Sequence, residues 1–222
     1  MPRAYGVPVS RWTGVADGVL QARYQPLDVN VLVVRGSDGL LVVDTRSSHQ
    51  EGAEIRRDLR ALGDVPVRAV VNTHAHYDHF SIQDLERLRK ADTSVIAPPS
   101  VAERLEGDVH SIAPGEVIET SLPGVDVRAV PAYNTSKRDA EGRPFHPREA
   151  GCVGFELSVR GERLYHAGDT DVIPEMDWVV GADVALLPVS GVYVMTALEA
   201  AEAARRIQPA VAVPMHWGEH IG

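Results

Sequence analysis

Three histidines and one aspartate fall within six positions of this chain, and this run constrains the fold and the chemistry more than any other feature. The run is His74-Ala75-His76-Tyr77-Asp78-His79, and it follows a strand-like segment over residues 68–73. Imidazole nitrogens and carboxylate oxygens are ligands of borderline-soft divalent cations such as Zn²⁺. Side chains of an extended segment point alternately to opposite sides, so a bent loop after the strand is needed before all four converge. With nine histidines in 222 residues, chance accounts poorly for three in one hexapeptide.

The hexapeptide resembles the H-x-H-x-D-H metal-binding signature of the metallo-β-lactamase superfamily. Three further segments support this resemblance in their order along the chain: Asp44-Thr45 at the end of an early strand, Gly168-Asp169-Thr170 after a late strand, and Pro214-Met215-His216 near the C-terminus. They match the superfamily's strand-end aspartate, its bridging aspartate and its final metal-binding histidine. The agreement runs from about residue 29 to the end, and its order is more specific than any single motif.

The resemblance and the order of expected elements predict an α/β fold, a four-layer αββα sandwich of the metallo-β-lactamase type with the metals at its edge. A single domain over residues 1–222 is expected, since this length can bury a sizeable core. Strands are expected at 29–35, 40–44, 68–73, 94–96, 116–119, 126–130, 152–160, 162–166, 184–187 and 210–213. Helices are expected at 50–62, 81–89, 100–105 and 196–207, with Ser81/Asp84 and Thr196/Glu199 resembling capping boxes. Pro131 cannot donate to a ladder and is expected to end its strand.

The resemblance implies a two-metal site. It assigns His74 and His76 to a first site, Asp78, His79 and His216 to a second site, and Asp169 to a bridge between the two. Chemistry supports a bridge independently, because one carboxylate can hold two cations. Taken alone, Asp169 would be read as a turn residue and His216 as a packed histidine. A histidine at position 76, where the oxygen-reducing di-iron branch typically has Glu, favours zinc, although manganese, iron and nickel accept the same ligand types. Two Zn²⁺ per chain are expected from the resemblance.

The third ligand of the first site departs from the superfamily's pattern. A histidine usually follows the strand that here covers residues 127–130, but this chain has Asn134, whose amide is a poor zinc ligand. The nearest candidate is His146, which is expected to take this place; the alternative is a weak first site completed by solvent. The stretch from about residue 115 to 222 resembles little-characterised bacterial and archaeal metal-dependent hydrolases that look related to sugar-acid-phosphate lactonases.

Two further residues are expected to support the ligands. Asp44 should lie behind the hexapeptide and accept hydrogen bonds from its loop, the alternative being an exposed turn residue. His166 is expected to be structural, with a contact to a metal ligand as the alternative.

These residues predict a metal-dependent hydrolase, with zinc as the expected metal. Two cations would generate hydroxide near neutral pH for attack on a lactone, ester, amide or phosphoester, and Asp78 is the candidate catalytic residue that orients it or accepts its proton. A small-molecule substrate is expected; it could be anionic if cations of the loop 136–149 contact it, although a solvated loop is the favoured interpretation. Two alternatives remain: a mononuclear iron dioxygenase acting on persulfides, and a non-catalytic ligand-binding domain on the same fold.

Composition limits the expected binding partners and cellular location of the protein. A net charge of −9 without a basic block argues against nucleic-acid binding. No apolar run is long enough to span a membrane, the first residues lack a signal pattern, and Cys152 is the single cysteine. A cytoplasmic protein without a membrane partner is therefore expected, which disfavours a periplasmic β-lactamase; the oligomeric state stays open.

Overall fold

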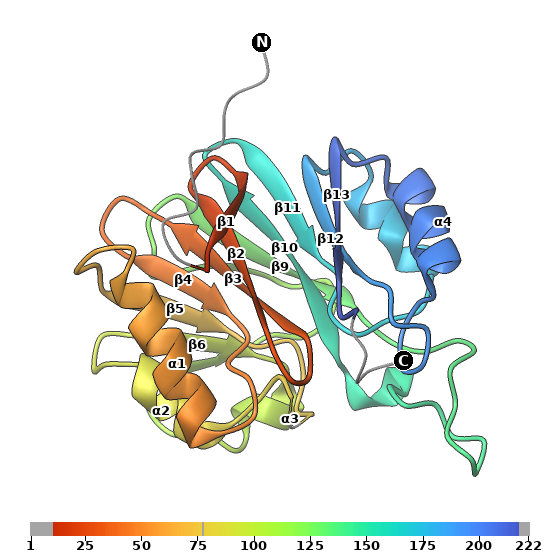
Figure 1. Cartoon of the computed structure of the whole chain (residues 1–222), viewed down its shortest axis with the longest axis horizontal. Helices are drawn as coiled ribbons and strands as arrows, with labels where there is room; N and C mark the ends of the chain where they lie inside the picture. Colours follow the sequence, from red (N-terminus) through yellow and green to blue (C-terminus); the bar gives the residue numbers. More distant parts are fainter. Residues whose placement is uncertain (1–10, 77, 218–222) are drawn as a thin grey trace.

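Two β-sheets pack face to face in the computed structural model, which describes residues 11–76 and 78–217 (Figure 1). The first sheet contains, in spatial order, β1 (Thr13–Ala16), β2 (Val19–Tyr24), β3 (Val29–Arg35), β4 (Leu40–Val43), β5 (Val67–Val71), β6 (Ser94–Ala97) and β7 (Val109–Ser111). The second contains β13 (Val211–Met215), β12 (Val184–Pro188), β11 (Glu162–His166), β10 (Val153–Val159), β9 (Val125–Pro131) and β8 (Val117–Glu119).

Helices cover the outer face of each sheet. The helices α1 (His49–Arg60), α2 (Ile82–Leu88) and α3 (Pro99–Ala102) lie on the first sheet, and α4 (Ala197–Ile207) lies on the second (Figure 1). The order of layers is therefore helix, sheet, sheet, helix, and the predicted αββα class is confirmed. No helix in the described residues combines the length and the apolar character needed to cross a membrane.

The central strands explain why the sequence carries near-continuous aliphatic runs. Every residue of β3 except Arg35 is buried. Leu32 and Val34 join the core that includes the second sheet, whereas Val31 and Val33 pack with the helices on the other face. A strand covered on both faces needs apolar residues at successive positions rather than at alternate ones.

The helix caps are partly as predicted. Thr196 and Glu199 form a complete capping box at the start of α4. Ser81 caps α2 by accepting from the Asp84 N–H, but the Asp84 carboxylate accepts from the Gly52 N–H of α1 at 3.1 Å instead of closing a box. The hydrogen bond between α1 and α2 therefore takes the place of the one that would close a capping box within α2.

Pro131 ends its strand, as predicted, but it is itself part of the strand and not the first residue after it. It is the last residue of β9 and lies opposite Val153. The next pair, Ala132 and Cys152, is hydrogen-bonded, so Pro131 occupies a position in the antiparallel ladder where no N–H is required. The Val153 N–H donates instead to the Thr73 carbonyl at 3.1 Å, which joins the second sheet to the loop after β5.

The strand directions bring the candidate ligands to one edge. Strands β4 to β7 run parallel to one another, as do β11 to β13. Asp44 follows β4, His74 follows β5, Asp169 follows β11 and His216 follows β13. The carboxyl ends of these strands are where side chains from both sheets can meet.

Candidate metal centre

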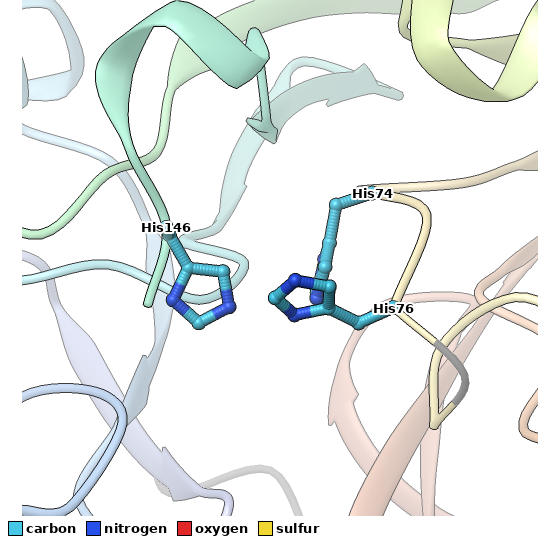
Figure 2. Close-up of side chains that lie close together, drawn as sticks. All are labelled: His74, His76 and His146. Carbon is cyan, nitrogen blue, oxygen red and sulfur yellow. The ribbon is translucent and has the colours of Figure 1, made fainter. Parts of the chain in front are cut away.

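Seven side chains form two adjacent clusters at this edge. One cluster is His74, His76 and His146, and the other is Asp78, His79, Asp169 and His216; within each cluster the potential ligand atoms lie within 4.8 Å of one another. Figure 2 shows the first cluster, in which the rings of His74 and His76 lie opposite the ring of His146, carried by another segment. All seven residues singled out in the sequence are thus brought together, and their role as ligands stays a prediction.

Asp169 lies between the two clusters and presents one oxygen to each. Its Oδ2 is 4.0 Å from His74 Nε2 and 3.5 Å from His146 Nε2. Its Oδ1 is 3.7 Å from His79 Nε2 and 3.6 Å from His216 Nε2. The residue is only 4% exposed. This is the arrangement that a carboxylate shared by two cations requires.

Asp44 holds the loop of the hexapeptide through a network behind the ligands. Its Oδ2 is 2.7 Å from His79 Nδ1, and the Thr73 hydroxyl lies 3.1 Å from Oδ1 and 3.0 Å from Oδ2. The same hydroxyl is 2.9 Å from His74 Nδ1. A Thr73 hydroxyl that donates to Asp44 can accept from His74 Nδ1–H, which leaves His74 Nε2 free toward the centre. His79 Nε2 also faces the centre, where it lies 2.9 Å from His216 Nε2. The contacts expected of Asp44 are confirmed.

Asn134 contacts His146 through its side-chain amide. Its Oδ1 accepts from the His146 backbone N–H at 2.7 Å and lies 3.0 Å from the ring Nδ1. Its Nδ2 donates to Asp171 Oδ1 at 3.2 Å and to the Tyr193 carbonyl at 2.9 Å. The sequence showed only that Asn134 stands near the place of a usual histidine ligand. These hydrogen bonds could not be predicted from it, because they connect segments 12 to 59 residues apart.

Burial and mutual charge set the protonation of the centre. Burial lowers the pKa of His146 to about 4 and that of His74 well below its ordinary value, so both are neutral at pH 7. Burial also acts to lower the pKa of His79, but the carboxylates of Asp78, Asp169 and Asp44 raise it to about 10. The pKa of Asp169 is lowered despite its burial, because imidazoles surround it.

The donor set fits divalent cations. Three buried atoms that face the centre, His74 Nε2, His146 Nε2 and Asp169 Oδ1, have no hydrogen-bond partner in the described residues. Buried polar atoms are rarely left unsatisfied, so these need a partner. Tetrahedral zinc with bonds near 2.1 Å places its ligand atoms about 3.4 Å apart. The His79–Asp78, His79–Asp169 and His216–Asp169 separations are 3.5, 3.7 and 3.6 Å, whereas the Nε2 atoms of His79 and His216 are closer, at 2.9 Å.

The backbone turns sharply where residues of the centre and of its support leave the strands. Asp44 and His216 have φ values of +64° and +54°, in the left-handed region that costs a non-glycine residue about 1–2 kcal/mol. Gly168 precedes Asp169 with a φ of +63°, and a Cβ there would lie 2.7 Å from the Val153 carbonyl oxygen. The centre therefore stands on strained turns that the surrounding sheets hold in place.

The remaining predicted residues lie around the centre. His166 is buried and accepts from the Gly168 N–H at 3.3 Å through Nδ1, which agrees with a structural role. Burial raises the pKa of the Cys152 thiol to about 11, so it stays protonated at neutral pH. The loop cations are engaged within the protein: Lys137 with Glu199, Arg143 with Asp139 and Glu141, Arg148 with Glu175, and Arg138 with the Gly142 carbonyl.

Known proteins share this fold and sequence pattern. Residues 41–217 match the family described as the β-lactamase superfamily domain. The chain therefore belongs to the metallo-β-lactamase superfamily, as the order of motifs predicted.

Its relatives include proteins described as UPF0173 metal-dependent hydrolases. The relative from Thermoplasma acidophilum is 36% identical over 157 residues, which cover 67% of this chain and 64% of the relative. The relative from Opitutus terrae is 32% identical over 162 residues, covering 70% and 69%. The chain thus spans slightly less than two thirds of the first relative's length.

Solved structures agree with the fold. A protein of Parabacteroides distasonis, provisionally called a metal-dependent hydrolase, superimposes with a TM-score of 0.71 and 29% identity over 90% of this chain and 83% of the other. Igni18 from Ignicoccus hospitalis, described as a metallo hydrolase, gives 0.63 and 22% over 85% and 79%. The latter likeness concerns the fold alone.

Proposed function

We propose that this chain is a metal-dependent hydrolase whose centre holds two zinc ions. The observation that carries the proposal is the buried Asp169 carboxylate, with Oδ2 toward His74 and His146 and Oδ1 toward His79 and His216. Imidazole and carboxylate ligands suit zinc. When bound, two such cations lower the pKa of a water molecule and polarise a carbonyl or phosphoryl oxygen. The description of the relatives as metal-dependent hydrolases supports the same class.

The residues of the two clusters have different parts in this proposal. His74, His76 and His146 would hold the first cation, Asp78, His79 and His216 the second, and Asp169 would contact both. Asp78 differs from the rest of the second cluster because it is only half-buried. Its Oδ2 lies 3.5 Å from His79 Nε2 and 3.8 Å from His216 Nε2, so it is close to the second site and also within reach of solvent. We assign it the orientation of the attacking water and the acceptance of its proton.

The surroundings favour an uncharged carbonyl substrate. The four cations of the loop 136–149 are engaged with protein groups, which leaves a phosphate no unengaged cation among them. Three exposed large apolar side chains also lie on segments that carry or contact site residues: Val192, Tyr193 and Trp217. A lactone, ester or amide therefore suits the site better than a phosphoester.

Metal analysis of the purified protein, followed by a substrate panel, tests the proposal. We expect about two zinc equivalents per chain, loss of activity on chelation and recovery on adding zinc, with turnover of lactones or carboxylic esters ahead of phosphodiesters. Iron as the bound metal together with oxygen uptake on glutathione persulfide would instead establish the dioxygenase alternative. Failure to bind any divalent metal would leave the ligand-binding alternative. His110→Ala is a suitable control, because this histidine is half-exposed and pairs with Asp108 instead of a cluster residue.

A further inference from the structure

We propose that Asn134 is a positioning residue that fixes the ring of His146 so that its Nε2 faces the first metal site. The inference rests on the proposed function, because it assigns His146 as a ligand of that site. It adds a role for a residue whose identity breaks the sequence pattern of the superfamily. Asn134 occupies the position where the pattern expects a ligand, and in this structure it contacts the ligand that takes that place.

The hydrogen bonds of Asn134 allow only one orientation of its amide. A side-chain amide has two N–H donors and two acceptor lone pairs. Here Oδ1 faces the backbone N–H and the ring Nδ1 of His146, while Nδ2 donates to Asp171 and to the Tyr193 carbonyl. A rotation by 180° would turn the amide oxygen toward a carboxylate and its N–H groups toward a backbone N–H. Since Asn134 is only 6% exposed, water could not compensate for such a rotation.

This orientation fixes which nitrogen of His146 carries the proton. An amide oxygen only accepts, so the Nδ1 that lies 3.0 Å away must carry a proton, which makes Nε2 the nitrogen that can present a lone pair to a metal. The Nε2 lone pair then faces Asp169 Oδ2 at 3.5 Å and has no hydrogen-bond partner in the described residues. Two acceptors held opposite each other in a buried place repel, and a cation between them converts this repulsion into two bonds.

Asp171 connects Asn134 to the bridging carboxylate. Its Oδ2 accepts from the backbone N–H groups of Thr135 at 2.8 Å and Ser136 at 2.7 Å, and its Oδ1 accepts from Asn134 Nδ2 at 3.2 Å. Asp171 lies two residues after Asp169. The same short segment therefore places the shared ligand and anchors the amide that orients His146, which sets the distance between the two ligands.

The metal affinities of variants test this role separately from the ligand role of His146. Zinc and cobalt are titrated into metal-free parent, Asn134→Ala, His146→Ala and the double variant, with competition by a chelator and the cobalt absorption spectrum as readouts. We expect Asn134→Ala to weaken one of two sites by about 10–100-fold, the usual effect of losing a group that orients a ligand, and to leave the other within about threefold. The double variant should bind no more weakly than His146→Ala, because Asn134 acts through His146.

Two further measurements keep the outcome decisive. If Asn134→Ala fails to fold, the exchange Asn134→Asp with Asp171→Asn serves in its place with a smaller expected loss, since it keeps an acceptor beside the His146 ring and one amide opposite one carboxylate. In the metal-free parent, ¹⁵N–¹H spectra should show His146 protonated at Nδ1, and in Asn134→Ala they should show a shifted tautomer balance. Asn30→Ala is the matched control, since Asn30 is buried but its amide has no hydrogen-bond partner in the described residues.

The possible failures are distinguishable. Parental affinity at both sites in Asn134→Ala, or losses that add in the double variant, would overturn the positioning role. Parental affinity at both sites in His146→Ala would instead overturn the ligand role on which it rests.

Discussion

Asp44→Asn should weaken the second metal site without removing any proposed ligand. In the parent, Asp44 Oδ2 lies 2.7 Å from His79 Nδ1, a charge-assisted hydrogen bond that holds a proton on Nδ1, so that Nε2 is the nitrogen available to bind a metal. In the variant, an amide N–H group in this place would face the ring N–H. The ring would then shift its proton to Nε2, where it blocks the metal.

The size of the effect follows from this contact. A buried hydrogen bond to a charged group contributes about 1.5–3 kcal/mol. Each 1.4 kcal/mol corresponds to about a factor of ten in a dissociation constant. Zinc affinity at the second site should therefore fall by about 10–100-fold. A smaller loss is expected at the first site, because Asp44 reaches His74 only through the Thr73 hydroxyl.

Chelator competition with zinc, with folding monitored by circular dichroism, measures both sites in the variant. Thr73→Val is the matched comparison, since it removes the hydroxyl beside His74 and leaves the His79–Asp44 bond in place. It should weaken the first site more than the second, the reverse of Asp44→Asn. If both variants weakened the same site, or if Asp44→Asn folded normally and bound zinc as the parent does, the assignment of proton positions would be wrong.

Three other perturbations have defined outcomes. Asp169→Ala should lose metal at both sites together, as measured by elemental analysis, because each cluster faces one of its oxygens; retention of one full equivalent would contradict a shared carboxylate. Burial raises the pKa of Asp84 to about 6, above its unfolded value near 4, so its contribution to stability is present below pH 4 and is lost as pH rises from about 4 to 6. Urea unfolding should show this loss in the parent and not in Asp84→Asn. Gly154→Ala should lower the free energy of unfolding by about 1–3 kcal/mol, because its Cβ would lie 2.4 Å from the Ala167 carbonyl oxygen; an unchanged melting temperature would show that the backbone yields freely.

The sequence predicted the central elements because their patterns are strong. Near-continuous aliphatic residues mark β3 and β4, and the Thr196 capping box marks the start of α4. The strands β1 and β2 were not predicted, because β2 mixes Gln21 and Arg23 with its apolar residues and β1 is at most partly buried. Their pairing with β3 makes them strands, and neighbouring strands are not visible in a local pattern.

The site divides in the same way. The hexapeptide could be recognised because its candidate ligands are adjacent in sequence. Asp169 and His216 could be predicted because the segments that contain them follow the order of the superfamily's motifs. The position of His146 was predicted from the need for a third imidazole, and the structure places it 3.5 Å from Asp169. The role of Asn134 could not be found this way, because its partners depend on the folding of the loop between β9 and β10.

Neither sheet carries a complete metal centre, and this has a consequence for assembly. The loop after β5 supplies His74, His76, Asp78 and His79, while Asp169, His216 and His146 come from segments of the second sheet. A cation bound to the full ligand set therefore stabilises only the state in which the two sheets are docked, by an amount that grows with the free metal concentration. Bound metal would then hold the two sheets together, and the free metal concentration would determine how well the docked state resists heating or proteolysis.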